Sequence, residues 1–369
     1  MHDNHDNQDE QSQANQQDGS MSRRYFLKVA AGSVTASAGG LVAGCVRSPD
    51  AKIAPPTDTQ LAAKRTTDSP LAIAQCQSYD QDVFAVLKPY LKDLDLPDLK
   101  NKVVLIKPNM IDVIPGRPIC TNPAVIKAAA ELADYLGAKE VIVGEGPAHN
   151  RDTEFLLAQS GPGALYKQLG LRFVDLNLDD LEKMDNPEPF SKLEHIYFPK
   201  TVAHADAIIS VPKMKTHHWA RITCSMKNLY GCIPGRKYGW PKNVLHYHGI
   251  DNCILDINRL LKPAIALVDA VVAMEGDGPI MGTPKETKFV MLGTDAVAVD
   301  ATCARIMGID VHNVPYLRVA GQVIGNTDQV KIKVIGETMQ SVATQFQPAP
   351  CFDAKGRSIK FDDPNAATS

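Results

Sequence analysis

Several common classes of site are excluded by what this sequence lacks. Its eight cysteines include no C-x-x-C pair, so neither a zinc ribbon nor an iron–sulfur motif of the ferredoxin type is present. No G-x-x-x-x-G-K-[ST] run and no EF-hand spacing occurs, which excludes a P-loop and that type of calcium loop. After residue 45 no apolar run is long enough to span a membrane. Any function must therefore rest on other residues.

One long segment also lacks acidic residues. Residues 211–242 contain no Asp or Glu, although the whole chain has a formal net charge of −3. The segment carries seven basic residues: Lys213, Lys215, Arg221, Lys227, Arg236, Lys237 and Lys242. These charges are solvated, paired across the fold, or used to bind an anion. Because the run is interleaved with aromatic residues, glycines and prolines, we expect a loop over a pocket that binds a small anionic molecule. Nucleic acid is not expected as a partner of this acidic chain.

The N-terminus has the features of an export signal. The run S-R-R-Y-F-L-K at 22–28 is similar to a twin-arginine motif, and L-V-A-G-C at 41–45 is similar to a lipobox. We therefore predict a signal peptide over 1–45, export by the twin-arginine machinery, and lipidation of Cys45. The protein would then be anchored to the membrane on the periplasmic side of the cell envelope. The alternative is a cysteine that only follows a secretory cleavage site. Residues 46–70, rich in Pro, Thr, Ser and charge, are predicted to be a flexible tether.

The remaining pattern is typical of an α/β fold. Short apolar runs alternate with helical patterns, which predicts a mostly parallel sheet with helices on both faces over 71–345. Strands are expected at L-A-I-A-Q-C, K-V-V-L-I-K-P-N, E-V-I-V-G-E-G-P, L-R-F-V-D-L-N, A-D-A-I-I-S-V-P, A-I-A-L-V-D-A-V-V, K-F-V-M-L-G and K-I-K-V-I-G. A helix should begin after Asn122, with Pro123 in its first turn, and end at Gly137. The less regular 150–204 is a possible insertion or lid, and 346–369 a polar tail.

Polar residues follow several of the expected strands. In open α/β sheets ligands bind at the carboxyl ends of the strands, so these residues are the candidates for a site. They include Lys107, Asn109, Glu145, His149, Asp175, Lys213, Lys215, His217, His218, Asp269, Glu275, Asp277, Asp295 and Asp300. For Asp295 a simple helix-capping role is equally expected, because an apolar helical run follows it.

The acidic run D-A-V-V-A-M-E-G-D-G-P allows two interpretations. Its carboxylates Asp269, Glu275 and Asp277 could bind a divalent metal, or they could be the missing partners of the basic segment. His246 is a further candidate ligand, which extends the choice to a transition metal. Separately, Cys224 and Cys232 either form a disulfide, help to hold a metal, or are two semi-buried thiols.

The ordered motifs together resemble one family. K-P-N, G-E-G, V-P-K-M-K-T-H, T-x3-K-N-L-Y-G, D-x5-E-G-D-G-P and G-T-D-x2-A-x-D, over about residues 71–336, are similar to domain of unknown function 362. The resemblance implies an α/β protein, in a family that often carries a twin-arginine signal or a fused iron–sulfur domain, with no established reaction. Because this chain lacks the cluster cysteines, the electron-transfer role of fused members is not expected here.

From these patterns we predict an enzyme that acts on a small anionic substrate, with a metal as an optional cofactor. The expected catalytic residues are His217, Lys215 and Glu145. The expected substrate-binding residues are Lys107, Asn109, Lys213, Lys227, Asn228 and Arg236. A lipoprotein that binds an anionic solute without turnover, or that supports a redox complex, is the alternative.

Overall fold

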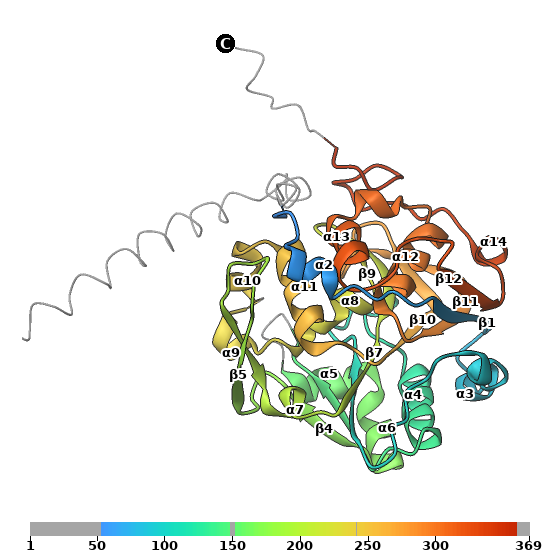
Figure 1. The fold of residues 1–369 in the computed structure, drawn as a ribbon. Helices are drawn as coiled ribbons and strands as arrows, with labels where there is room; N and C mark the ends of the chain where they lie inside the picture. Colours follow the sequence, from blue (N-terminus) through green and yellow to red (C-terminus); the bar gives the residue numbers. More distant parts are fainter. Residues whose placement is uncertain (1–52, 148–151, 241, 360–369) are drawn as a thin grey trace, which may run out of the picture. The chain divides into compact units, whose positions relative to one another are not determined.

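The described part of the chain in this computed structural model comprises residues 53–147, 152–240 and 242–359. The predicted signal peptide and Cys45 lie outside these residues. A single large sheet runs through the described region (Figure 1). Along the sheet the strands follow the order β12 (Ile332–Gly336), β1 (Ser69–Gln75), β11 (Thr283–Gly293), β10 (Ile265–Glu275), β7 (Ala207–Val211), β2 (Val103–Pro108), β3 (Glu140–Glu145) and β4 (Arg172–Asp175).

Most neighbouring strands of this sheet are parallel, as the sequence predicted. The parallel pairs are β12–β1, β10–β7, β7–β2, β2–β3 and β3–β4. Along this order of strands the exception is β11, which is antiparallel to both β1 and β10. A turn at Gly276–Gly282 joins β10 directly to β11, and a direct turn of this kind permits only antiparallel pairing.

Helices cover both faces of the sheet, because alternate residues of its strands face two separate cores. In β2, for example, Leu105 belongs to one core, whereas Val104 and Ile106 belong to the other. The second core is covered by α3 (Val83–Leu87), η2 (Lys88–Asp93), α4 (Pro123–Tyr135) and α6 (Pro162–Leu169). The first is covered mainly by α8 (Ser225–Asn228), η3 (Leu229–Cys232), α11 (Ile250–Leu261), α12 (Ala296–Ile306) and α13 (Pro315–Val323).

The remaining helices are short. They are α2 (Asp58–Ala62), α5 (Thr153–Ser160), α7 (Lys200–Ala203), α9 (Gly235–Tyr238), α10 (Asn243–Tyr247), η4 (Val311–Asn313) and α14 (Met339–Val342). The best-predicted helix is α4: the Asn122 side chain accepts a hydrogen bond from the Ala124 backbone, Pro123 is its first residue, and Gly137 follows it with φ +85°.

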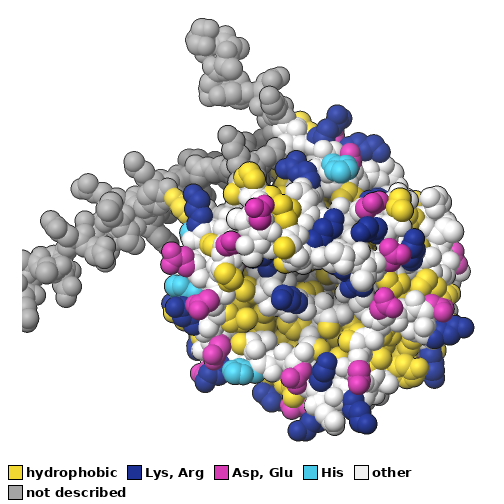
Figure 2. Space-filling view, in the orientation of Figure 1, with side chains coloured by type: hydrophobic (Ala, Val, Ile, Leu, Met, Phe, Trp, Pro, Cys, Tyr) yellow, Lys and Arg dark blue, Asp and Glu magenta, His cyan; other side chains and the backbone are white. Residues whose placement is uncertain are grey.

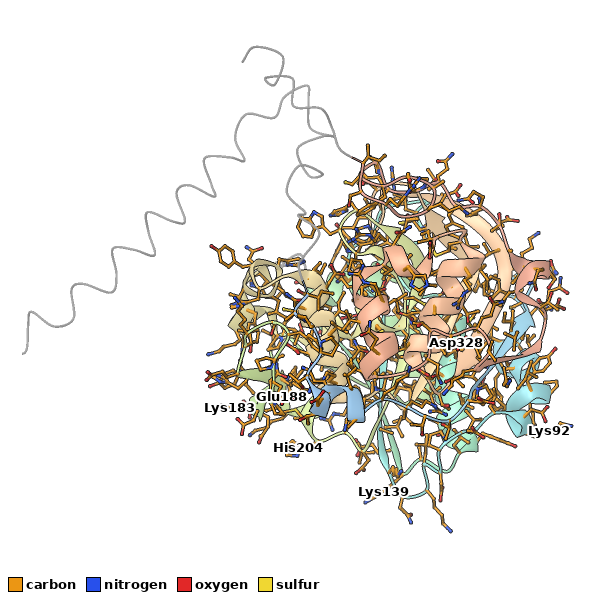
Figure 3. The ribbon with its side chains drawn as sticks, turned by 45° about the horizontal axis from the view of Figure 1, so that its top comes forward. Lys92, Lys139, Lys183, Glu188, His204 and Asp328 are labelled. Carbon is orange, nitrogen blue, oxygen red and sulfur yellow. The ribbon has the colours of Figure 1, made fainter. Side chains whose placement is uncertain are left out.

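The irregular segment 150–204 divides into two parts. Its first part continues the main fold, since β4 lies at the edge of the large sheet. Its second part is a separate antiparallel hairpin of β5 (Leu181–Asp185) and β6 (His195–Pro199). Glu188, in the turn of this hairpin, lies beside α2 (Figure 3) and accepts a hydrogen bond from the Thr57 hydroxyl at 2.7 Å.

The predicted tether and the predicted polar tail are both partly packed onto the fold. In the expected tether, α2 has a capping box formed by Thr57 and Gln60, and Gln60 is buried. In the expected polar tail, Phe346 and Phe352 are buried. The polar composition of both segments concealed these anchoring side chains.

The start of the basic segment is a buried strand, where the sequence predicted a loop. After Pro212 the chain forms β8 (Lys213–His217), which pairs with β10 and turns back into β9 (Arg221–Thr223). Every residue of β8 is buried. A lysine-rich strand can be buried here because its amines find partners on neighbouring strands, as described below.

Candidate functional site

The centre of the site is a buried ion pair between two neighbouring parallel strands. Lys107, near the end of β2, places its Nζ 2.6 Å from a carboxylate oxygen of Glu145, at the end of β3. Both side chains are almost completely buried. The Glu145 carboxylate also accepts the backbone N–H groups of Met110 at 2.9 Å and Gly146 at 2.8 Å. These bonds fix the position of the Glu145 carboxylate beside the Lys107 amine.

Gly231 covers this ion pair, and no larger residue fits in its place. A Cβ atom on Gly231 would lie 2.5 Å from both Cε and Nζ of Lys107 and closer still to a Glu145 oxygen. The glycine therefore allows the backbone of η3 to approach the charged pair directly. Asn228, just before η3, further fixes this approach by donating its amide N–H to the Lys107 carbonyl at 2.8 Å.

A second buried ion pair joins the basic segment to the acidic run. The Lys213 Nζ lies 2.6 Å from a carboxylate oxygen of Asp269 on β10, and both side chains are buried. Tyr79 bridges the pair: it accepts a hydrogen bond from Lys213 and donates one to Asp269, each at 2.8 Å. The prediction that Asp269 supplies a missing partner of the basic segment is confirmed.

Lys215 lies between these two pairs and is bound by neutral groups. Its Nζ donates to the Asn109 side-chain oxygen at 2.6 Å and to the Ile119 carbonyl at 2.8 Å. Burial without a carboxylate partner lowers the pKa of Lys215 to about 7, and the nearby Lys213 and Lys107 charges also lower it. Near neutral pH this amine is therefore present in both charged and neutral forms.

Two further lysines complete the cluster. Lys242 is buried and donates to the carbonyls of Gly146 at 2.8 Å and Tyr230 at 3.0 Å, and burial lowers its pKa to about 8. Lys227, on α8, is partly exposed, and its Nζ lies 4.1 Å from the centre of the Tyr230 ring. Desolvation lowers the pKa of Lys227 to about 7, followed in size by the repulsion of Lys242 and Lys215.

Positive groups outnumber negative ones in this lysine cluster, which we define as Lys107, Lys213, Lys215, Lys227 and Lys242. Within the ranges that the structure describes, ion pairs join the cluster to two carboxylates, those of Glu145 and Asp269. The other three lysines contact carbonyl oxygens, an amide oxygen or an aromatic ring. The cluster therefore has an uncompensated positive charge.

A row of rings lies next to the lysine cluster. The His217 and His218 rings are 4.9 Å apart, His218 and Trp219 are 5.0 Å apart, and Trp219 and His246 are 4.9 Å apart. His246 in turn lies 5.5 Å from Tyr230. The row thus connects the end of β8 to the ring on which Lys227 rests.

Two histidines of this row, His217 and His246, are held in their neutral form. Nδ1 of His217 accepts the backbone N–H groups of Trp219 at 3.0 Å and Ala220 at 3.3 Å, which places the ring proton on Nε2. Burial, with repulsion from His218 and Lys227, keeps the pKa of His217 well below its usual range. Burial also lowers the pKa of His246 to about 4. A neutral imidazole can pass on a proton without adding a positive charge to the cluster.

The expected metal ligands are not brought together. Among the described residues no group of three or more His, Cys, Asp or Glu side chains could hold a metal ion. Asp269 is paired with Lys213, whereas Glu275, further along β10, is paired with Lys285 on β11 at 2.8 Å. His246 lies in the aromatic row. Asp269 and Glu275 are six residues apart on the extended strand β10, so the two carboxylates do not share one position.

Three other candidates lie outside the cluster. Arg236 on α9 is exposed and donates to the Leu178 carbonyl at 3.2 Å. Asp295 caps α12, as the alternative interpretation held, by accepting the N–H groups of Val297 and Ala298. Asp300 is buried and accepts the N–H groups of Ser225 and Met226, which fixes the start of α8.

Of the three alternatives for Cys224 and Cys232, the structure bears out the two thiols and not the disulfide. Both are free, buried thiols, and the Cys224 sulfur lies 3.6 Å from that of Cys303. Sequence reasoning also missed Tyr79 and the position of Gly231. Tyr79 follows the first strand of the sheet, so the strand-end rule that identified Lys107 would have included it.

The surface gives no sign of a large basic patch on the face shown in Figure 2. There Lys and Arg side chains are interspersed with Asp and Glu. The excess positive charge of the basic segment is instead concentrated in the buried lysine cluster. A small anion fits such a site better than a polyanion does.

Comparison with known proteins identifies the family. The domain of unknown function DUF362 matches residues 104–305, which contain the whole lysine cluster. The chain belongs to the DUF362 family. This DUF362 protein is also 27% identical over 215 residues to a thylakoid-associated protein of Synechocystis sp., covering 58% of this chain and 65% of that relative. The match thus spans slightly less than two thirds of the relative.

Two solved structures are similar to this DUF362 protein at a low level. The lactate racemase apoprotein of Thermoanaerobacterium thermosaccharolyticum is 12% identical with a TM-score of 0.39, covering 66% of this chain and 57% of that one. A protein of Thermotoga maritima is 11% identical with a TM-score of 0.32, covering 62% and 58%. Both are too distant to support a functional comparison. No helix in the described residues is long and apolar enough to cross a membrane.

Proposed function

We propose that this DUF362 protein is an enzyme that binds a small anionic substrate at the lysine cluster. The observation that supports this is the excess of five lysines over two paired carboxylates. Burying unpaired charge is costly, and a bound anion would offset that cost. Lys227 and the neighbouring rings would meet the substrate first, because Lys227, His218 and His246 are partly exposed whereas Lys215 and His217 are buried.

Within this proposal the residues have different tasks. Lys107 and Lys213 are held in ion pairs with Glu145 and Asp269, and these two pairs form the fixed frame of the site. Lys215 and Lys227 have pKa values near 7, which suits groups that exchange a proton with a substrate. His217 and His246, whose rings are neutral, would relay protons between other groups.

We also propose that the protein acts at the cell envelope, attached through a lipid on Cys45 after export by the twin-arginine route. The support is the sequence of residues 22–45, together with the thylakoid association of the Synechocystis relative. The sequence of residues 22–45 and the name of the relative agree on membrane association alone.

The proposed function is tested first by measuring anion binding and then by looking for turnover of a substrate. Sulfate, oxalate and phosphate are titrated calorimetrically into the wild type, Lys227→Met and Lys237→Met. Lys237 is the matched control, since its Nζ also lies over a tyrosine ring, Tyr197 at 4.4 Å, but on the exposed α9. We expect the first substitution to weaken anion binding at least tenfold and the second to leave it unchanged. Equal effects of the two, or no binding of any anion, would contradict the proposal.

Turnover is then followed by ¹H and ³¹P NMR with a panel of small carboxylates and phosphate esters. A spectral change that depends on Lys227 supports an enzyme. Anions that bind tightly and are recovered unchanged across the panel would instead favour a binding lipoprotein.

A further inference from the structure

Lys227 differs from the other four lysines of the cluster in what its amine contacts. Each of the other amines donates a hydrogen bond to at least one oxygen. In the described part of the chain, the contact found for the Lys227 amine is the face of the Tyr230 ring, at 4.1 Å. Lys227 is also the partly exposed member of the set. Its side chain is therefore the one of the five that is partly accessible from the surface.

The surroundings of Lys227 favour a neutral, nucleophilic amine. It shares its site with positive charges at Lys242, Lys215 and Lys107, and these, after burial itself, oppose its protonation. A lysine that is neutral near pH 7 is a nucleophile toward carbonyl carbon, whereas an ordinary lysine is almost entirely protonated there. The face of the Tyr230 ring contacts the Lys227 nitrogen but offers no hydrogen-bond donor to its lone pair.

A proton carrier is also present. Nδ1 of His246 lies 3.1 Å from the Lys242 carbonyl, to which it donates, so the neutral ring presents Nε2 as a proton acceptor. His246 contacts the same Tyr230 ring as Lys227, with the two ring centres 5.5 Å apart. Lys227 and His246 therefore both lie against the Tyr230 ring.

We propose that Lys227 forms an imine with a small aldehyde or ketone that also carries a carboxylate or phosphate group. This proposal rests on the proposed function, because the acidic group would bind the excess positive charge of the lysine cluster. The nitrogen lone pair attacks the carbonyl carbon, and a proton moves from nitrogen to oxygen, with His246 as the carrier. Loss of water then forms the C=N bond. The step is reversible and needs no oxidant, reductant or other reactant.

The test is reductive trapping of the full chain. Glyoxylate is added with sodium cyanoborohydride at pH 7, and the labelled lysines are identified by peptide mass spectrometry. We expect Lys227 to be labelled at least roughly tenfold faster than the exposed Lys237, since far more of an amine with a pKa near 7 is neutral. Glycolaldehyde, which has no acidic group, should label Lys227 more slowly than glyoxylate does. Excess sulfate should slow the reaction with glyoxylate.

A Lys227→Arg variant separates this proposal from the one on which it rests. Arginine keeps the positive charge but forms no imine, so the variant should still bind sulfate and should lose the fast label. Labelling of Lys227 no faster than of Lys237, with sulfate binding intact, would overturn the imine and leave the anion site standing. Loss of sulfate binding in the wild type would refute the anion site itself. Equal labelling by glyoxylate and glycolaldehyde would refute the need for an acidic group.

Discussion

Anion binding to the lysine cluster should be accompanied by proton uptake. Lys215 and Lys227 have pKa values near 7, so at that pH each carries a proton about half of the time in the empty site. A bound anion favours the charged form of both amines. Binding at pH 7 should therefore take up roughly one proton, which is half a proton for each of the two lysines.

The uptake should depend on pH in a defined direction. At pH 6 both amines are already largely protonated, and the uptake should be close to zero. At pH 8 both are largely neutral, and Lys242, with a pKa of about 8, also contributes, so the uptake should rise to roughly two protons. By the same linkage the affinity should fall roughly 100-fold between pH 6 and pH 8.

Calorimetry measures this quantity directly. Sulfate is a suitable ligand because it does not itself titrate in this range, and the slope of the observed enthalpy against the ionisation enthalpy of the buffer gives the number of protons taken up. Lys215→Met should halve the uptake at pH 7, while Lys237→Met should not change it. Sulfate that binds with the same affinity at pH 6 and pH 8, and without proton uptake, would refute the reasoning from the two shifted pKa values.

Four further outcomes are expected. Gly231→Ala should destabilise the protein by about 1–3 kcal/mol in chemical denaturation and weaken sulfate binding, because the added methyl group forces the ion pair apart; a variant as stable as the wild type would contradict this. Lys213→Met should cost about 3–5 kcal/mol, since it leaves Asp269 buried without its cation. Between pH 7 and pH 9 the Lys215 side chain is protonated in the unfolded chain but largely neutral in the folded protein. It should therefore raise the free energy of unfolding by up to about 1.4 kcal/mol per pH unit. The Lys215→Met variant should lack this contribution to the pH dependence. Cys45→Ser should release the exported protein from the membrane fraction, and unchanged fractionation would argue against a lipid anchor.

The sequence allowed much of the sheet to be predicted. Helix α4 was predictable because its start and end signals are local: an Asn cap, a Pro in the first turn and a Gly at the end. The ends of β2, β3 and β7 were predictable because parallel strands place their carboxyl ends at one edge, which brought Lys107, Asn109 and Glu145 to the same place. Strand β8 was missed because its K-M-K-T-H run is polar by composition, and its burial depends on partners in other strands.

The expectation that the carboxylates of the acidic run act together has the same origin as the failure to predict β8. Sequence spacing suggested that Asp269, Glu275 and Asp277 act together, since they lie within one short run. On an extended strand, however, six residues span roughly 20 Å, so Asp269 and Glu275 cannot share one ion. Asp269 and Glu275 are each paired instead with a lysine on a neighbouring strand, Lys213 on β8 and Lys285 on β11. Only the order of strands in the sheet determines those partners.

The empty site therefore has two ways to limit its excess charge. One is loss of protons from Lys215 and Lys227, which their lowered pKa values describe. The other is binding of an anion, which restores those protons. Loss of protons and binding of an anion change the charge of the same nitrogen atoms in opposite directions. Anion binding to the site and protonation of Lys227 are therefore thermodynamically linked. A ligand with an acidic group and a carbonyl group would need both protonation states of the lysines. Its acidic group is attracted by the charged amines, and its carbonyl carbon reacts with one neutral amine.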